Sequence, residues 1–418
     1  MSLLVKHCGH RRGGWPALGA LALGLAAPGA RAEQWVVENS LASRYETNDN
    51  AALAQSSPGS MNTLSLSTAW AAARRTESSA TRMNAAVTSL SQWGPGAQDR
   101  VDGQLGLGQS LSDTLNSVNL GLQYLQDFNS TVGNNDVTVG RGRRRSRTLS
   151  GAWARSLTER VSVNTQLSLE RTAYGQALAG ATDYRNTALS GSLSYRLTEV
   201  DTLSLDASHS DYRTEADTNR STTDQVGLGV SKVLSDRNSA SLSLGLYRTQ
   251  TQALRSRLVC PLADSFCDAG FVSPVVATDR VYTTGQGLQF SLSERYQFDE
   301  TTDFSFSAAR QQLPSGAGLV VRSDTLRASV SHAFSPTVNG AVNYAQSRST
   351  YLGLDASAPR PAQQNLAVWM TRQLAADLSL QLSYQFSRAH GAFAGQDARS
   401  NSVSVSVSYD WPKFDATR

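Results

Sequence analysis

The densest chemical feature of this 418-residue chain is the segment Arg-Gly-Arg-Arg-Arg-Ser-Arg. Guanidinium groups bind phosphate and carboxylate through paired hydrogen bonds, so such a cluster predicts contact with an anion. Gly133, Asn134 and Asn135 precede the cluster, which we therefore expect in a loop over 127–147. A solvated loop without a ligand is the alternative. The candidate residues for binding an anion or a polysaccharide are Arg141, Arg143, Arg144, Arg145 and Arg147.

Cysteines supply a second candidate site. The chain has three, of which Cys8 lies in the N-terminal segment discussed below, while Cys260 and Cys267 are close together. In an exported protein this spacing predicts a disulfide that closes a small loop, with two free thiols as the alternative. A structural zinc site needs further Cys or His ligands, so we predict no metal site.

Enzymatic chemistry is weakly represented. Beyond the N-terminal segment the histidines are His209, His332 and His390, far apart in the sequence. A hydrolase would need a serine, a histidine and a polar orienting group brought together. We predict no catalytic residues, no cofactor and no enzyme; a membrane-embedded hydrolase is the weaker alternative.

Regularly spaced turns indicate that these candidate residues lie on or between β-strands. Short polar turns between alternating apolar residues begin at positions 111, 157, 197, 234, 298, 334 and 374, and a less regular one lies at Arg75-Thr76-Glu77. Each turn joins two strands, so eight turns imply sixteen strands. A first strand near Trp35–Tyr45 and a last near Asn401–Trp411 bring the number to about 18, within a range of 16–18.

Apolar and polar residues alternate along the strands, which indicates which face of each strand contacts lipid and which contacts water. In the last strand Val403, Val405 and Val407 alternate with Ser402, Ser404 and Ser406. An apolar face toward lipid and a polar face toward a wet lumen are typical of a transmembrane β-barrel. We predict an all-β fold: one antiparallel transmembrane β-barrel with short periplasmic turns and longer extracellular loops. A soluble β-sandwich is the alternative.

The first 32 residues predict a cleaved secretory signal peptide. Lys6, Arg11 and Arg12 precede an apolar stretch, and Ala30-Arg31-Ala32 resembles a cleavage site. The barrel then occupies 33–418. Residues 1–32 hold four of the 38 basic residues and none of the 34 acidic ones, so the remainder is formally neutral. This balance gives no support to nucleic acid as a partner.

These features together resemble a known family. Leu-Ser/Thr-Asp/Glu turns, Ser-Leu-Ser-Leu strands and the terminal strand Ser402–Trp411 are similar to outer-membrane β-barrel porins, in particular those found with exopolysaccharide-production systems. The resemblance implies localisation in the bacterial outer membrane. It also implies contact with outer-membrane lipid and lipopolysaccharide, and recognition by the barrel-assembly machinery, whose signal ends in an aromatic residue; Trp411 or Phe414 could supply it.

Two functions follow as hypotheses. The first is a porin-like channel for passive passage of small solutes, sugars or an exported polysaccharide. The second is a plugged barrel that anchors surface polysaccharide or scaffolds an export complex through its loops. In either case the arginine run would contact lipopolysaccharide phosphates outside, or an acidic polymer at a pore mouth.

Overall fold

The computed structural model describes residues 34–129, 142–175, 181–261, 267, 269, 271–273, 275–316, 318–352, 361–391 and 397–417. The predicted signal peptide, 1–32, lies outside them. Among the described residues no helix is long and apolar enough to cross a membrane.

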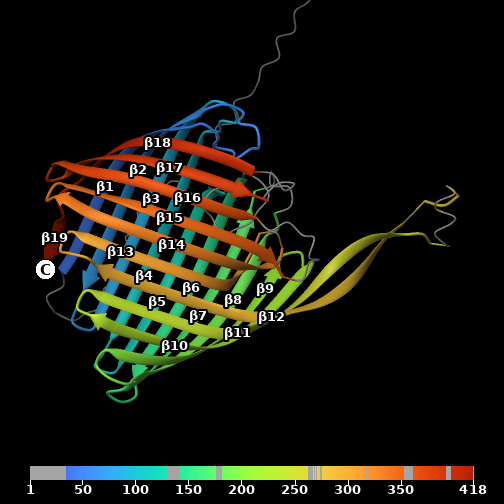
Figure 1. The fold of residues 1–418 in the computed structure, drawn as a ribbon, viewed down its shortest axis with the longest axis horizontal. Coiled ribbons are helices and arrows are strands. Elements are labelled where there is room, and N and C mark those ends of the chain that lie inside the picture. Colours follow the sequence, from blue (N-terminus) through green and yellow to red (C-terminus); the bar gives the residue numbers. More distant parts are fainter. Residues whose placement is uncertain are drawn as a thin grey trace, which may run out of the picture. The chain divides into compact units, whose positions relative to one another are not determined.

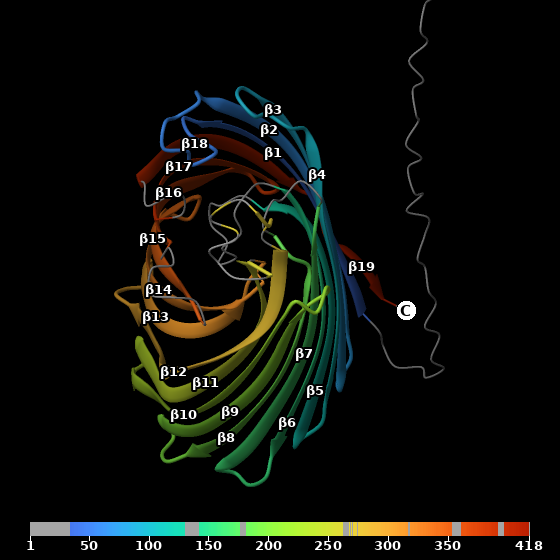
Figure 2. The same cartoon turned by 90° about the vertical axis from the view of Figure 1, so that its right-hand side faces the viewer.

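Eighteen antiparallel strands form a closed ring (Figures 1 and 2), which confirms the predicted fold class. Each strand pairs with its neighbour in the sequence, and β1 pairs with β18 from Ser40↔Asp410 to Asn48↔Ser402. The strands are β1 Gln34–Asn48, β2 Met61–Arg75, β3 Ser79–Trp93, β4 Arg100–Ser112, β5 Asn116–Asn129, β6 Gly142–Ser156, β7 Val161–Tyr174, β8 Tyr184–Arg196, β9 Asp201–Thr214, β10 Asn219–Ser235, β11 Asn238–Val259, β12 Val275–Gln297, β13 Thr302–Pro314, β14 Val320–Ser335, β15 Val338–Tyr351, β16 Ala362–Ala375, β17 Leu378–His390 and β18 Asp397–Asp410.

A short nineteenth strand, β19 (Phe414–Thr417), extends the closure. The Trp411 amide donates to the Asn39 carbonyl at 3.0 Å, Pro412 interrupts the pattern, and β19 then pairs with the first residues of β1. Both Trp411 and Phe414 therefore lie along the β1 edge.

All eight predicted turns join consecutive strands at one end of the barrel. Side chains that accept backbone hydrogen bonds close them: Thr158 Oγ1 accepts from the Val161 amide at 3.0 Å, and Asp299 Oδ1 from the Thr301 amide at 2.8 Å. Hydrogen bonds from the Thr301 hydroxyl and backbone lower the pKa of Asp299 to about 2, so this turn keeps an ionised acceptor at neutral pH.

The barrel is apolar outside and polar inside. On β18 the outward Val403 and Val405 are 56% and 41% exposed, whereas the inward Ser402 and Ser404 are 6% and 5% exposed. Outward leucines on β4, β5, β10 and β11 are similarly exposed. A closed barrel with an apolar outer band is the architecture of bacterial outer-membrane proteins, so this protein is an outer-membrane β-barrel.

The wall divides between β12 and β13 at the long-loop end. Pairing of these strands stops at Phe290↔Arg310, whereas β11 and β12 stay paired out to Val259↔Val275. The β11–β12 hairpin consequently projects beyond the other strands (Figure 1). The β13–β14 hairpin takes a different path, into the lumen.

We expect Leu244→Arg to destabilise the folded barrel and Ser243→Arg, its neighbour on the lumen face, to be tolerated. Leu244 lies outward in the middle of the β11 apolar stretch and is 56% exposed. Arginine facing lipid near the bilayer midplane costs about 2–4 kcal/mol. Urea-induced unfolding of both variants from lipid vesicles measures the difference. Equal stability of the two would contradict the assigned faces.

Candidate functional site

Hydroxyl and amide side chains line the inside of the barrel. Hydroxyls on neighbouring strands bond to one another across the ladder: Ser383 with Ser404 at 2.6 Å, Ser379 with Ser408 at 2.6 Å and Ser241 with Ser293 at 2.7 Å. These short side chains give the inner face of the wall a polar character.

Four adjacent strands form a lumen wall without charged groups. The inward positions are Asn339 to Ser349 on β15, Gln363 to Thr371 on β16, Ser379 to Ala389 on β17 and Ala398 to Ser408 on β18. They carry Ser, Thr, Asn, Gln, Ala and one aromatic residue, Trp369. The charged residues within these stretches occupy the outward positions. We call this surface the neutral wall.

Several charged groups elsewhere in the lumen are paired. Arg44 contacts Glu46 at 2.7 Å and Arg100 contacts Asp102 at 3.2 Å. Arg144 holds Asp127 through two hydrogen bonds, of 3.0 and 2.7 Å. Pairing cancels most of the field these residues would set up in the lumen.

A cavity of about 660 Å³ lies toward the short-turn end, where β9 to β15 curve around it. Its lining is again rich in hydroxyls and amides, including Ser241, Ser293, Ser305, Ser307 and Asn343. Arg295, Arg327 and Lys232 line this end together with Glu199 and Glu294, so the cavity carries charges of both signs. The site can thus hold a hydrated or hydroxylated molecule several heavy atoms in size.

The tip of the β13–β14 hairpin narrows the lumen near the long-loop end. Ser315 and Val321 are fully buried, and the Tyr212 hydroxyl donates to the Ser315 carbonyl at 2.8 Å. The Thr182 amide donates to the Gly316 carbonyl at 2.7 Å. The hairpin tip is therefore fixed to the chain that enters β8 and to β9, across the lumen from its own strands.

Glycine is required at one point in this tip. Gly318 has a φ of +81°, and a Cβ there would lie 2.9 Å from Asn219 Nδ2 on β10. A side chain would strain the backbone and press against the wall on which the tip rests.

Aromatic packing secures the tip. Tyr184, Tyr212 and Tyr247 form a buried cluster with Val320 and Leu352, and the rings of Tyr184 and Tyr212 are 5.2 Å apart. Gln225 Nε2 donates to Gln312 Oε1 at 3.0 Å, which adds a contact from β10 to β13. These contacts define the constriction: residues 312–316 and 318–321, the three tyrosines and Leu352.

The predicted arginine run does not form a loop. Arg143, Arg144, Arg145 and Arg147 lie in β6, because the strand extends further toward its loop than the run of polar residues indicated. Alternation then divides the cluster: Arg144 faces the lumen and bonds to Asp127, while the other three face outward. Arg141 lies outside the described residues. Nothing in this arrangement tests their binding role.

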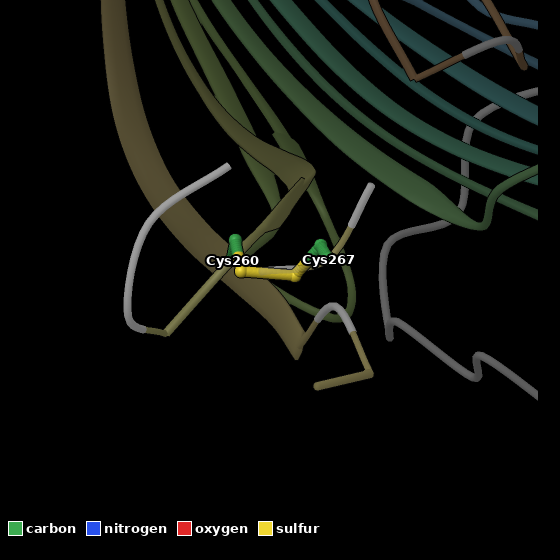
Figure 3. The surroundings of a disulfide bond; sticks show 2 residues. All are labelled: Cys260 and Cys267. Carbon is green, nitrogen blue, oxygen red and sulfur yellow. A yellow bond between two sulfur atoms is a disulfide. The ribbon is translucent and has the colours of Figure 1, made fainter. Parts of the chain in front are cut away.

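A disulfide joins Cys260 and Cys267, whose Cα atoms are 5.9 Å apart. Figure 3 shows the two side chains meeting just beyond the paired part of the β11–β12 hairpin. Since β11 ends at Val259 and β12 begins at Val275, the bond lies at the projecting end. It is not part of the constriction described above.

The histidines lie on three separate strands. His209 Nδ1 is 2.7 Å from Asp224, His332 Nδ1 is 2.8 Å from the Thr302 hydroxyl, and His390 contacts Asp397. Within the part of the chain that the structure describes, no three His, Cys, Asp or Glu side chains are placed to hold a metal ion. The expectation that the chain is not an enzyme stays a prediction.

Sequence reasoning missed the constriction, because it predicted only longer extracellular loops at this end of the barrel. Leu319, Val320 and Val321 are consecutive apolar residues, but Leu366 to Met370 in the regular strand β16 are too, so the run alone was not a sufficient signal. All three are buried, at 9%, 5% and 0% exposure, so both faces of the chain are covered at this point. Only a segment inside the barrel meets that condition.

No family model and no curated protein matches this chain. Among solved structures it is similar to OccAB3 of Acinetobacter baumannii, with 10% identity over 91% of this chain and 99% of the other, and a TM-score of 0.47. It is also similar to OpdQ of Pseudomonas aeruginosa, with 10% identity over 90% of this chain and 99% of the other, and a TM-score of 0.46. A third similar structure is OpdK of the same organism, solved with vanillate. It has 11% identity over 91% of this chain and 99% of the other, and a TM-score of 0.46.

We expect Tyr212→Phe to loosen the constriction without unfolding the barrel. The change removes a hydrogen bond to the buried Ser315 carbonyl, which also accepts from the Gly318 amide. A bond of this kind contributes about 0.5–1.5 kcal/mol. Hydrogen exchange of the 313–321 backbone should accelerate several-fold. Tyr282→Phe, at a ring that is 72% exposed, is the control and should change nothing.

Proposed function

We propose that this protein is a passive outer-membrane channel for small uncharged polar solutes, with sugars as the favoured class. The observation that carries the proposal is the neutral wall: four adjacent strands present hydroxyl and amide groups to the lumen without a charged side chain. The paired charges on the other strands support the same conclusion.

The chemistry of the wall explains the preference. A sugar that enters a narrow pore loses water and needs both donors and acceptors to replace it. Serine, asparagine and glutamine side chains offer both, and serine hydroxyls can rotate to suit the solute. A wall with little net charge neither concentrates nor repels ions of one sign, so it favours solutes by hydrogen bonding and size.

Trp369 adds an apolar surface to this wall. Its register partners are Ala341 on β15 and Ser383 on β17, which leaves the indole among small side chains on the lumen face. Indole combines a flat apolar face with one polar N–H. That combination suits the apolar face and the hydroxyl rim of a sugar ring.

The constriction supports a rival function. It fills part of the lumen, as a plugged barrel that anchors surface polysaccharide or scaffolds an export complex would require. It also narrows the route for an exported polysaccharide chain, so small solutes are the cargo that we propose.

Liposome swelling and planar-bilayer conductance distinguish these functions. We expect refolded barrel to admit glucose faster than glucuronate, a similar-sized anion, because the neutral wall offers no cationic site. Replacing residues 315–319 by two glycines should raise single-channel conductance, since the constriction is removed. No swelling and no current with the native chain, together with opening in the shortened variant, would instead establish a plugged barrel.

Trp369→Ala should weaken sugar binding in the open channel, seen as a smaller glucose-induced drop in current. The matched control is Trp153→Ala, because Trp153 faces outward and is 40% exposed. If Trp369→Ala kept the full sugar response, Trp369 would have no role in binding the solute. The liposome-swelling test of the channel would not be affected by that outcome.

A further inference from the structure

Five arginines stand side by side in one row across five strands. The register pairs Arg147 of β6 with Arg171 of β7, Arg171 with Arg185 of β8, Arg185 with Arg213 of β9, and Arg213 with Arg220 of β10. These strands are consecutive in the wall (Figure 1). Directly opposite residues have Cβ atoms about 4.5–5.5 Å apart, at which distance like charges destabilise a sheet. We call these five residues the arginine row.

The arginine row faces outward, at the edge of the apolar band that is nearer the long loops. Arg147 lies two residues from Leu149, and Arg171 two residues from Leu169, on the same faces; these leucines are 50% and 39% exposed. Thr172, which follows Arg171, is 1% exposed and points inward, as does Tyr212 beside Arg213. The row therefore lies where the hydrocarbon ends, on the side of the long loops.

Acidic residues balance only part of this charge. Asp211 bonds to both Arg213 and Arg220, each at 2.7 Å, and Glu215 lies 3.0 Å from Arg171. Arg147 and Arg185 form no ion pair with any described residue, and both are exposed. With Asp217, which interacts electrostatically with Arg213, three carboxylates thus face five guanidiniums, and Arg145 extends the same outward face of β6.

We infer that the arginine row binds the phosphate groups of a phosphorylated glycolipid in the outer leaflet. Guanidinium groups bind phosphate oxygens through paired hydrogen bonds, and neighbouring arginines can share one phosphate. The lipid's acyl chains would cover the leucines directly below the row. A lipid phosphate is the ligand that fits both the arginine row and the leucines beside it, since a free anion has no apolar part that could contact the leucines.

Like charges across a ladder also call for a counter-ion. Bound phosphate would turn the repulsion within the row into attraction, so the glycolipid would stabilise β6 to β10 as well as adhere to them. The row lies outside the lumen, so this inference does not depend on the proposed transport function.

The test compares lipid binding by two triple variants in detergent, measured by native mass spectrometry. One variant carries Arg147→Gln, Arg171→Gln and Arg185→Gln. The matched control carries Arg155→Gln, Arg160→Gln and Arg372→Gln, which remove the same charge at the short-turn end. We expect bisphosphorylated lipid A to bind the row variant at least ten-fold more weakly than the native chain, and the control variant like the native chain.

Further arms identify the ligand. Dephosphorylated lipid A should bind the native chain as weakly as bisphosphorylated lipid A binds the row variant, and equimolar inorganic phosphate should not displace lipid A. Equal binding with and without lipid phosphates, displacement by free phosphate, or tight binding of alginate, an acidic polysaccharide without phosphate, would overturn the inference.

A second measurement separates binding from folding. In vesicles without lipid A the row variant should unfold at an equal or higher urea concentration than the native chain, because repulsion is relieved. Added lipid A should raise the unfolding midpoint of the native chain and not that of the row variant. Equal gains for both would also overturn the inference.

Discussion

The structure depends on one constraint: within the bilayer every backbone amide and carbonyl needs a partner in the protein. The pairing of β1 with β18 meets it by removing both edges of the sheet. Pro412 cannot donate to a ladder, and it lies just after Trp411, where the last strand reaches the end of the barrel. The pairing of β19 with the start of β1 then continues the same edge.

Closure also explains why apolar side chains face outward and polar side chains face inward, the opposite of their distribution in a soluble protein. Once the ladder is closed, one face of every strand must meet lipid and the other a lumen too wide to be filled by side chains. Valines and leucines are accordingly exposed, and serines such as Ser402 and Ser404 are buried. These buried serines pack the wall, and a passing solute would contact the partly exposed groups beside them, such as Asn343, Gln363 and Trp369.

The predictions that succeeded depended on patterns local in sequence. Turn residues such as Thr158 and Asp299 act within a few positions, and alternation assigns a face without knowledge of the neighbours, so the strand number and polarity were predictable. The arginine row was not, because five residues from five strands become adjacent only through register. The split of the Arg143–Arg147 cluster between two faces required knowing where β6 begins.

The constriction shows where the closure constraint is relaxed. Above Phe290↔Arg310 the β12–β13 ladder ends, so the backbone groups of both hairpins need other partners. The projecting β11–β12 hairpin can use water, since it lies beyond the apolar band. The β13–β14 tip instead uses the wall: Tyr212 bonds to Ser315, and the Thr182 amide bonds to Gly316. Such a rearrangement is tolerable only above the hydrocarbon, which is why the constriction forms at the long-loop end and the lumen below it keeps a regular wall.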